Sequence, residues 1–404
     1  MMTSPPYQHR PHRYTATFRV LTCSIGILVM CSLVRNYYLG TNFFKPALME
    51  TALLEDSTKP HAVSPSEDMQ PSKELAPAPT CNDTELELLK RNRFLRGGAA
   101  ILSFESRCPR STWLDDMLRL DYEDSKHSRL SVTVGCNKAI DAIGTARSLS
   151  HNPVFDKPVW GKTMENFTKQ TMSAVCFPKQ KWRKAGYAFD PKQLELSNTM
   201  TMVPLEFHCI EPIPSTFQGI QRSIKYLGLH QHGFQAHQYV MSNSSGSVPF
   251  PVGEAGIEHL SANMCSQADV TCHDVPMLTL DDFSTQHIRG KNQKVDVLNI
   301  DTEGFDWRVL RGARKVLEHT RYLEFEYHSF WGDDMLKDAV DYLEDLNFVC
   351  YFAGKGRLFK VTHGCWLNKL HEIHEWSNVA CVHRSEHDWL AIMEGYFQKT
   401  LAFG

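Results

Sequence analysis

Apolar residues recur with two different periods along the chain between residues 130 and 361. Short runs rich in Val, Ile, Leu and Phe, typical of buried strands, are followed by segments with an apolar residue every three or four positions, typical of helices. The strand-like runs are residues 130–134, 205–210, 236–241, 295–300 and 321–327, with closing strands at 348–352 and 358–361. This alternation predicts an α/β fold with a mostly parallel sheet and helices on both faces.

The segments between these strands predict helices at residues 137–149 and 215–227, another beyond the fourth strand, and one from an N-cap at Asp333 to about residue 347. Residues 151–203 break the pattern, because they are rich in Lys, Pro and aromatic residues and follow neither period. A compact domain seldom contains so long a loop without structure. We therefore predict an insertion here that lies over one edge or the mouth of the sheet.

An uncharged apolar stretch occupies residues 20–34, between Arg19 and Arg35. It is shorter than the ~20 residues that usually span a bilayer, but Tyr37 and Tyr38 extend it at an aromatic interface. Three interpretations are open: a signal anchor, a cleaved signal peptide and a buried core helix. We favour the signal anchor, because the arginines before the stretch keep the amino terminus in the cytosol and short spans suit the membranes of the early secretory pathway.

This interpretation predicts a single-pass type II membrane protein of the Golgi or endoplasmic reticulum. A stem is expected because residues 51–80 contain five prolines and too few large apolar residues to form a core; the alternative is a plain disordered tail. The predicted parts are a cytosolic tail (1–19), a transmembrane signal anchor (20–39), a flexible lumenal stem (40–100) and a lumenal catalytic domain (101–404) with its core at 130–350.

Cysteine and asparagine positions are consistent with the lumen. Ten of the 12 cysteines follow the predicted anchor, and Cys81 with Cys108, or Cys265 with Cys272, are candidate disulfides in an oxidising compartment. The chain has no CxxC pair and its carboxyl-terminal histidines lack a metal-binding spacing, so no metal site is predicted. Sequons that predict a glycoprotein begin at Asn82, Asn166 and Asn243.

Charge and composition exclude some classes of protein. The 404 residues include 43 basic and 46 acidic side chains, a net charge of -3, which differs from the basic footprint of a dedicated nucleic-acid-binding protein. With 42% hydrophobic and 22% charged residues, the chain is neither disordered throughout nor a polytopic membrane protein.

Ligands of open α/β sheets bind at the carboxyl ends of the strands, which makes the residues there candidates for a site. Gly135 and Asn137 follow the first strand, where a glycine permits close approach and a helix N-terminus suits an anionic group. Glu211 follows the second strand and is placed to accept two hydrogen bonds from a ribose; the alternative is an exposed turn acid. Asp301 and Glu303 follow the fourth strand, where two carboxylates seldom serve packing alone.

The fifth strand adds further polar candidates. Glu324, Glu326 and His328 alternate with apolar residues, so they project from one face. The alternative interpretation is an edge strand that faces solvent.

These residues resemble the motifs of FkbM-type S-adenosylmethionine-dependent methyltransferases. The family pattern is a hydrophobic strand followed by K-I-D-x-E-G, then x-V-L-x-G-A, then a strand that ends in E-x-H. Residues 295–328 follow this pattern, with Asn299 in place of the lysine. Residues 211–217 resemble the family's E-P-x-P-x-x-F, residues 278–282 its T-L-D-D segment and residues 133–139 its D-V-G-A-N-x-G, with Thr133 and Ala139 replacing the acid and the second glycine.

The resemblance covers about residues 130–350 and implies a Rossmann-like class I methyltransferase that uses S-adenosyl-L-methionine. It implies that Glu211 holds the ribose hydroxyls and that Gly135 and Asn137 belong to the turn that binds the methionine part. Asp301 and Glu303 are then expected to complete the donor site.

A lumenal address makes an O-methyltransferase with a glycan or other hydroxylated acceptor the favoured function. An alcohol nucleophile needs a base, and His328 or Asp301 is predicted to serve, with Glu326 orienting the histidine. Two alternatives remain: a Golgi glycosyltransferase, for which Asp301-Thr302-Glu303 is a variant of D-x-D, and a noncatalytic methyltransferase-like binding module. The predicted partners are the acceptor and, through the anchor, the membrane, with no nucleic acid.

Overall fold

A computed structural model describes residues 74–109, 111–122, 128–170, 202–254, 264–265, 269–290, 293–331, 335–368 and 372–403. The predicted cytosolic tail and signal anchor lie outside the described residues, as do Asp333 and residues 171–201 of the predicted insertion. No helix within the described ranges is long and apolar enough to cross a membrane.

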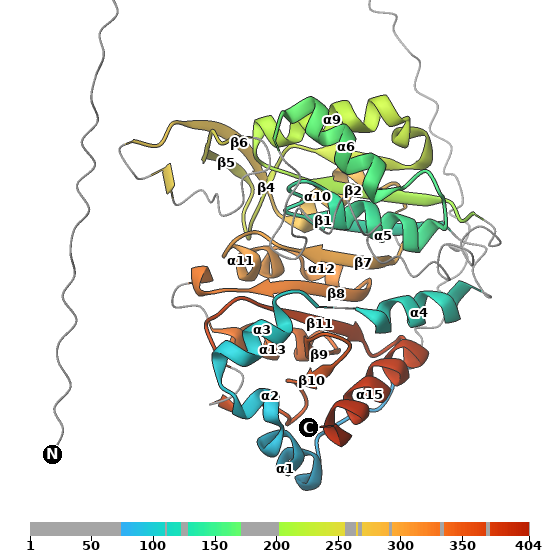
Figure 1. Cartoon of the computed structure of the whole chain (residues 1–404), viewed down its shortest axis with the longest axis vertical. Coiled ribbons are helices and arrows are strands. Elements are labelled where there is room, and N and C mark those ends of the chain that lie inside the picture. The colour runs from blue at the N-terminus through green and yellow to red at the C-terminus, as the bar shows by residue number, and fades with distance from the viewer. Residues whose placement is uncertain are drawn as a thin grey trace, which may run out of the picture. The chain divides into compact units, whose positions relative to one another are not determined.

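The main sheet has eight strands in the order β10-β9-β11-β8-β7-β1-β2-β3 (Figure 1). Strands β3, β2, β1, β7 and β8 run parallel, whereas β11 is antiparallel to both β8 and β9, and β10 is antiparallel to β9. The sheet is therefore mostly parallel, as predicted. Its strands are β1 Arg129–Val134, β2 Leu205–Ile210, β3 Phe234–His237, β7 Val295–Ile300, β8 Thr320–Tyr327, β9 Phe348–Ala353, β10 Leu358–Lys360 and β11 Ser377–His383.

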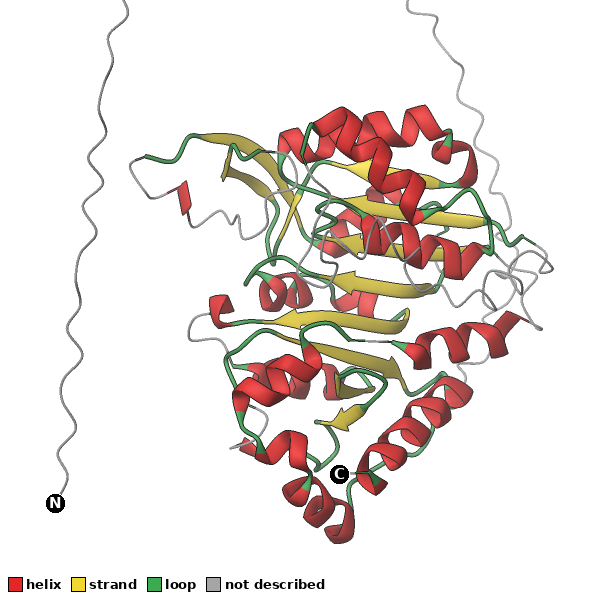
Figure 2. Cartoon of the chain, viewed as in Figure 1, coloured by secondary structure: helices red, strands yellow, loops and turns green. Residues whose placement is uncertain are grey.

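Helices cover both faces of this sheet (Figure 2). On one face, Trp113 of α4 donates a hydrogen bond to the hydroxyl of Tyr322 at 3.0 Å. On the other, Phe283 of α10 packs edge-on against His208, with ring centroids 5.6 Å apart. His208 is aligned across the sheet with Leu298 of β7, whereas Tyr322 is aligned with Val297, the residue before it. Successive residues of a strand project from opposite faces, so Tyr322 and His208 lie on opposite faces of the sheet. The helices are α4 Thr112–Tyr122, α5 Ile140–Ser150, α6 Lys157–Thr168, α9 Pro214–Leu227, α10 Leu280–His287, α11 Asp306–Arg311, α12 Arg314–Leu317, α13 Leu336–Asp345 and α15 His387–Ala402.

Two predicted elements differ from the structure for local reasons. Helix α5 begins at Ile140 rather than 137, because Asn137 (φ 43°) and Ala139 (φ 56°) have left-handed backbones. The strand predicted at residues 236–241 is two strands: β3 ends at His237, opposite the last residue of β2, and the chain then pairs elsewhere. The second strand, β4 (Val240–Met241), joins a separate sheet in the order β4-β6-β5, with β5 Gly246–Pro251 and β6 Cys272–Leu278.

Residues 81–100, which were predicted to belong to the flexible stem, lie in the folded domain. They form α1 (Asp83–Arg91), α2 (Arg93–Arg96) and the start of α3 (Ala99–Ser106). Leu89 and Leu95 are buried in the main core, which explains why this segment folds.

The disulfides correct one predicted pairing and confirm another. Cys81 bonds to Cys365 and not to Cys108, so the amino-terminal helices are tied to a loop near the carboxyl terminus. Cys265–Cys272 is present as predicted. Within the described residues, Cys136–Cys209 and Cys350–Cys381 are disulfides that were not predicted.

Candidate active site at the carboxyl ends of the parallel strands

The order of the strands reverses at β1, because β2 and β3 lie on one side of it and β7 and β8 on the other. Such a reversal is where open α/β sheets bind ligands, at the carboxyl ends of the strands. The turn after β1 begins at Gly135, whose φ is +79°. A Cβ atom there would lie 1.6 Å from the carbonyl oxygen of Asp301, so only glycine lets β1 and β7 approach this closely.

Glu211 joins the turns that follow β1 and β2. Its side chain is buried, and its two oxygens accept hydrogen bonds from the backbone N–H groups of Asn137 at 2.8 Å and Ile213 at 2.9 Å. Each carboxylate oxygen retains a second lone pair for a ligand. Burial raises the pKa of Glu211 to about 7, although both hydrogen bonds act in the opposite direction.

Asp306 stabilises the turn after β7. Its carboxylate accepts hydrogen bonds from the backbone N–H groups of Thr302 at 3.1 Å and Gly304 at 3.2 Å. Glu303, which was predicted to bind the donor, lies in this turn with a left-handed backbone (φ 53°). Burial raises the pKa of Asp306 to about 7. The sequence did not single out this aspartate; its signal is an acid at the first turn of a helix that follows a strand.

Register brings the predicted residues into one row. Val134 pairs with Ile210 on one side and Ile300 on the other, and Ile300 pairs with Phe325. One position further along these strands are Glu211, Gly135, Asp301 and Glu326, which we call the acidic row. Neighbours in parallel strands project from the same face, so the acidic row lines one edge of the face that α4 and α5 cover.

Asp301 and Glu326 are neighbours within the acidic row, because Ile300 pairs with Phe325 one position earlier. The side chain of Asp301 is exposed to solvent. Desolvation of its carboxyl group, then Glu303 and Asp306, raise its pKa above the ordinary value. Glu326 is only 5% exposed, and its pKa is also well raised, first by burial and then by Asp301.

His328 lies just beyond the end of β8 and is half-buried. Its ring stacks on Phe330, with centroids 4.3 Å apart, and its Nδ1 accepts a hydrogen bond from the Phe330 backbone N–H at 3.3 Å. Glu326, which was predicted to orient this ring, lies beside Asp301 in the acidic row. Strand β8 is central, between β7 and β11, so the alternative of a solvent-facing edge strand is wrong.

Unsatisfied polar atoms gather around this edge of the sheet. Buried side-chain atoms of native proteins nearly always have a hydrogen-bond partner, so a group of exceptions marks a place where a polar ligand fits. The buried atoms here that lack a partner within the described residues are Thr133 Oγ1, Asn137 Oδ1, Thr302 Oγ1, Glu326 Oε2 and Trp331 Nε1.

The disulfide Cys136–Cys209 was missed from the sequence. Cys136 follows Gly135 in the turn after β1. Cys209 belongs to β2, where it pairs with Thr133 of β1. It therefore fixes the turn that carries Asn137 against the strand that carries Glu211. Aligning the ends of the first two predicted strands places these cysteines close together, a signal that the prediction did not use.

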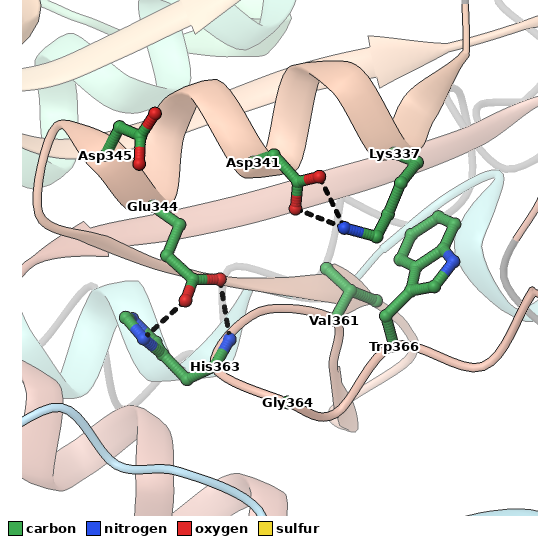
Figure 3. A pocket seen from close by; sticks show the side chains of 8 residues that line it. All are labelled: Lys337, Asp341, Glu344, Asp345, Val361, His363, Gly364 and Trp366. Atoms are coloured by element: carbon green, nitrogen blue, oxygen red, sulfur yellow. Dashed lines mark hydrogen bonds and ion pairs between the residues drawn. The ribbon is translucent and has the colours of Figure 1, made fainter.

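A separate pocket of about 470 Å³ lies beside α13 (Figure 3). Four of its five charged or ionisable side chains are paired with one another, Lys337 with Asp341 and Glu344 with His363 at 3.1 Å, and the fifth is Asp345. No member of the acidic row lines it. The acidic row, rather than this pocket, combines unpaired polar atoms with perturbed carboxyl groups.

Comparison with known proteins confirms the family resemblance. Residues 178–350 match the model of the methyltransferase FkbM domain. No curated protein sequence matches the chain.

Solved methyltransferase structures are similar at low identity. The METTL16 MTase domain is 8% identical with a TM-score of 0.31, over 68% of this chain and 65% of that one. The human methyltransferase 10 domain containing protein is 7% identical with a TM-score of 0.30, over 68% and 80%. Methyltransferase FkbM from Methylobacillus flagellatus KT is 11% identical with a TM-score of 0.33, over 75% and 56%. The chain thus spans less than two thirds of the first and third of these structures.

Proposed function

We propose that this chain, whose residues 178–350 match the methyltransferase FkbM domain, transfers a methyl group from S-adenosyl-L-methionine to a hydroxyl group of a glycan or similar acceptor in the secretory lumen. The observation that carries the proposal is the acidic row, which brings Glu211, Gly135 and Asp301 together at the point where the strand order reverses. These residues are far apart in the sequence, and packing alone does not require the three acids of the row, Glu211, Asp301 and Glu326, at one edge of a sheet.

The polar groups of the site fit the donor. The remaining lone pairs of Glu211 suit the two hydroxyls of a ribose, and the unpartnered Oδ1 of Asn137 suits a donor N–H or O–H group. The negative charge near Asp301 suits the positive end of the methionine part. When bound, the donor supplies a methyl group activated by a positively charged sulfur.

Asp301 is the better of the two predicted bases. Because Nδ1 of His328 accepts the Phe330 N–H, the neutral ring carries its proton on Nε2 and acts there as a hydrogen-bond donor. Asp301 is accessible and has a raised pKa, which suits a group that takes a proton from an alcohol. We assign His328 the role of orienting the acceptor oxygen and Asp301 that of removing its proton.

The disulfides support the secretory address and hence a glycan acceptor. Disulfides persist in oxidising compartments and are rare in the cytosol, and the domain contains Cys81–Cys365, Cys136–Cys209, Cys265–Cys272 and Cys350–Cys381. Glycan hydroxyls are abundant acceptors in such a compartment.

Calorimetry tests the donor site directly. The purified full chain is expected to bind S-adenosylmethionine, and Glu211→Gln is expected to weaken binding at least tenfold, because hydrogen bonds to a charged group contribute about 1.5–3 kcal/mol. Glu206→Gln, at the other end of β2, is the matched control and should bind normally. Equal affinity of Glu211→Gln and the unaltered protein would remove the ribose role.

The acceptor is tested in cells that lack the protein. Mass spectrometry of their glycans should show the loss of a methylated species, which returns with the unaltered gene but not with Asp301→Asn. A methylation pattern that does not depend on the gene argues against a glycan acceptor.

A further inference from the structure

Three aromatic side chains lie together beside the acidic row, and we call them the aromatic patch: His328, Phe330 and Trp376. Phe330 belongs to the short 3-10 helix η3 (Ser329–Trp331) after β8 and is 51% exposed. The ring of His328 stacks on Phe330, and the ring of Trp376 has its centroid 6.5 Å from that of His328. Single exposed aromatic residues are common on protein surfaces, whereas a group of rings beside a polar site is typical of a surface that binds a ligand.

The backbone holds Phe330 close to the turn that carries Asp301. A Cβ atom at Gly304, three residues after Asp301, would lie 2.5 Å from the carbonyl oxygen and 2.7 Å from the Cβ of Phe330. Gly304 has a positive φ of 96°, which, together with its missing side chain, permits this approach. The Phe330 side chain therefore starts from a fixed position next to the turn after β7, although its ring is exposed.

The pairing of β11 with β8 places Trp376. These strands are antiparallel, and Trp376 precedes the first residue of β11, directly across from His328. The Trp376 carbonyl oxygen accepts a hydrogen bond from the Ser103 hydroxyl at 2.8 Å, and the guanidinium carbon of Arg107 lies 5.1 Å from the centre of the ring. The carboxyl end of α3 thus holds this ring at the same edge of the sheet as Asp301.

The strand order separates the aromatic patch from the residues assigned to the donor. Glu211 and Gly135 follow β2 and β1, whereas the aromatic patch follows β8 and precedes β11. Strand β7, which carries Asp301 at its end, lies between these two pairs of strands (Figure 1). A donor at β1 and β2 and a second ligand on the aromatic patch would therefore meet at Asp301, the residue assigned as the base.

We propose that the aromatic patch is the acceptor subsite and that it binds a pyranose ring, which stacks on Phe330 and presents one hydroxyl to Asp301 and His328. The inference rests on the proposed function, because it takes the methyl acceptor as the ligand. The hydroxyl oxygen forms a bond to the methyl carbon as the carbon–sulfur bond of the donor breaks, and its proton passes to Asp301.

The chemistry of a sugar ring matches both parts of this subsite. C–H groups project from the faces of a pyranose, and the negatively charged face of an aromatic ring attracts them. The sugar hydroxyls donate and accept hydrogen bonds, so they can pair with the carboxyl group of Asp301 and with the Nε2–H of His328. The carboxyl groups of the acidic row favour an acceptor with several hydroxyls over a simple phenol, which has only one.

Methyl transfer to glycans tests the inference. Glycans released from the secreted proteins of cells that lack the protein serve as the acceptor pool, with the full chain and S-adenosylmethionine labelled in its methyl group. Phe330→Leu keeps the backbone and Cβ that contact Gly304 but removes the aromatic face. We expect it to raise the apparent KM for the glycan pool about five- to tenfold, with kcat changed little and donor affinity unchanged in calorimetry. Trp376→Leu should raise the same KM.

Two variants separate the aromatic face from other effects of substitution. Phe330→Tyr retains the ring and should keep the KM of the unaltered protein. Phe403→Leu is the matched control, because Phe403 is a 76% exposed phenylalanine that follows α15, and it should also keep this KM.

The outcomes distinguish the inference from the proposed function. An unchanged KM in Phe330→Leu, with transfer to glycans intact, would overturn the inference and leave the proposed function standing. Transfer to the phenol tyramine and not to glycans would overturn the assignment of a pyranose. Failure of the unaltered chain to bind S-adenosylmethionine would overturn the proposed function itself.

Discussion

Glu211 titrates close to neutral pH because it is buried between two turns, and this makes donor affinity dependent on pH. A ribose diol donates hydrogen bonds to the ionised carboxylate, and protonation removes one of the accepting positions. With a pKa raised to about 7, the group is ionised above this pH and protonated below it. Binding of 5′-methylthioadenosine should therefore weaken as the pH falls below about 7, by up to about tenfold per pH unit.

The measurement is a titration of affinity from about pH 5.5 to pH 8.5. Glu211→Gln cannot ionise, so its weaker binding should show no such slope. A slope of the same size in Glu211→Gln would assign the pH dependence to another group.

Gly135 is a second residue whose environment fixes its identity. Gly135→Ala places a methyl group 1.6 Å from the Asp301 carbonyl oxygen, so β7 has to move. We expect a loss of about 3 kcal/mol or more in the free energy of unfolding, measured by urea denaturation, together with loss of donor binding.

Gly228→Ala is the control for backbone strain alone. Gly228 has a similar positive φ of 68°, and a Cβ atom there meets nothing within 4 Å. Its expected cost is about 1 kcal/mol, from the left-handed backbone. Similar losses at both glycines would show that the contact with Asp301 is unimportant.

At the scale of elements, one buried cation holds several of them together. Arg321 of β8 contacts Asp121 of α4 at 2.6 Å, Asp296 of β7 at 2.9 Å and Glu386 before α15 at 2.9 Å. Arg321→Met leaves these acids short of a partner, and we expect it to cost about 3–5 kcal/mol in chemical denaturation. Arg314→Met, which breaks an exposed pair with Glu318, should cost less than about 1 kcal/mol.

The network also predicts how acid destabilises the domain. The pKa values of Asp121 and Glu386 are lowered to about 2 by the neighbouring cations, which outweigh the desolvation of both groups. Their stabilisation is complete above the ordinary carboxyl range near pH 4 and disappears as the pH falls from there toward 2. In Arg321→Met, the free energy of unfolding should decrease less between about pH 4 and pH 2 than in the unaltered protein. An unchanged pH profile in that variant would mean that Arg321 does not hold these groups ionised.

The elements that the sequence predicted best are those buried on both faces. Strands β1, β2, β7 and β8 were placed to within a residue, because continuous apolar runs between turn residues specify buried parallel strands. Strand β11 and helix α15 were not predicted. β11 lies between β8 and β9 in the sheet although it follows both of them in the sequence. The apolar residues of α15 do have helical spacing, at Trp389, Met393, Phe397 and Leu401.

At the scale of the whole molecule, the meeting of Gly135, Glu211 and Asp301 followed from the sequence because the carboxyl ends of parallel strands lie along one edge. The position of Glu326 beside Asp301 did not, because it depends on the register between β7 and β8, which the apolar pattern leaves open. Disulfides between distant cysteines also cannot be predicted from the sequence. Cys81 and Cys365 are 284 residues apart, and no local pattern distinguishes this pair from Cys81–Cys108.

The secretory address makes a prediction about the surface of the whole protein. Asn243 is exposed in the turn between β4 and β5, where a glycan can be attached without disturbing the core. Asn82 differs, because its side chain accepts a hydrogen bond from the Glu85 N–H and caps α1. If the domain enters the lumen, the full chain made in mammalian cells should carry a glycan at Asn243, removable by an endoglycosidase. Endoglycosidase treatment should therefore change the electrophoretic mobility of the chain, and Asn243→Gln should abolish the part of this shift that is due to the glycan at Asn243. Ser244→Ala changes only the middle residue of the sequon and should retain it. A chain that folds with its disulfides formed but shows no glycosidase-sensitive shift would argue against passage through the lumen, and with it against a lumenal glycan as the acceptor.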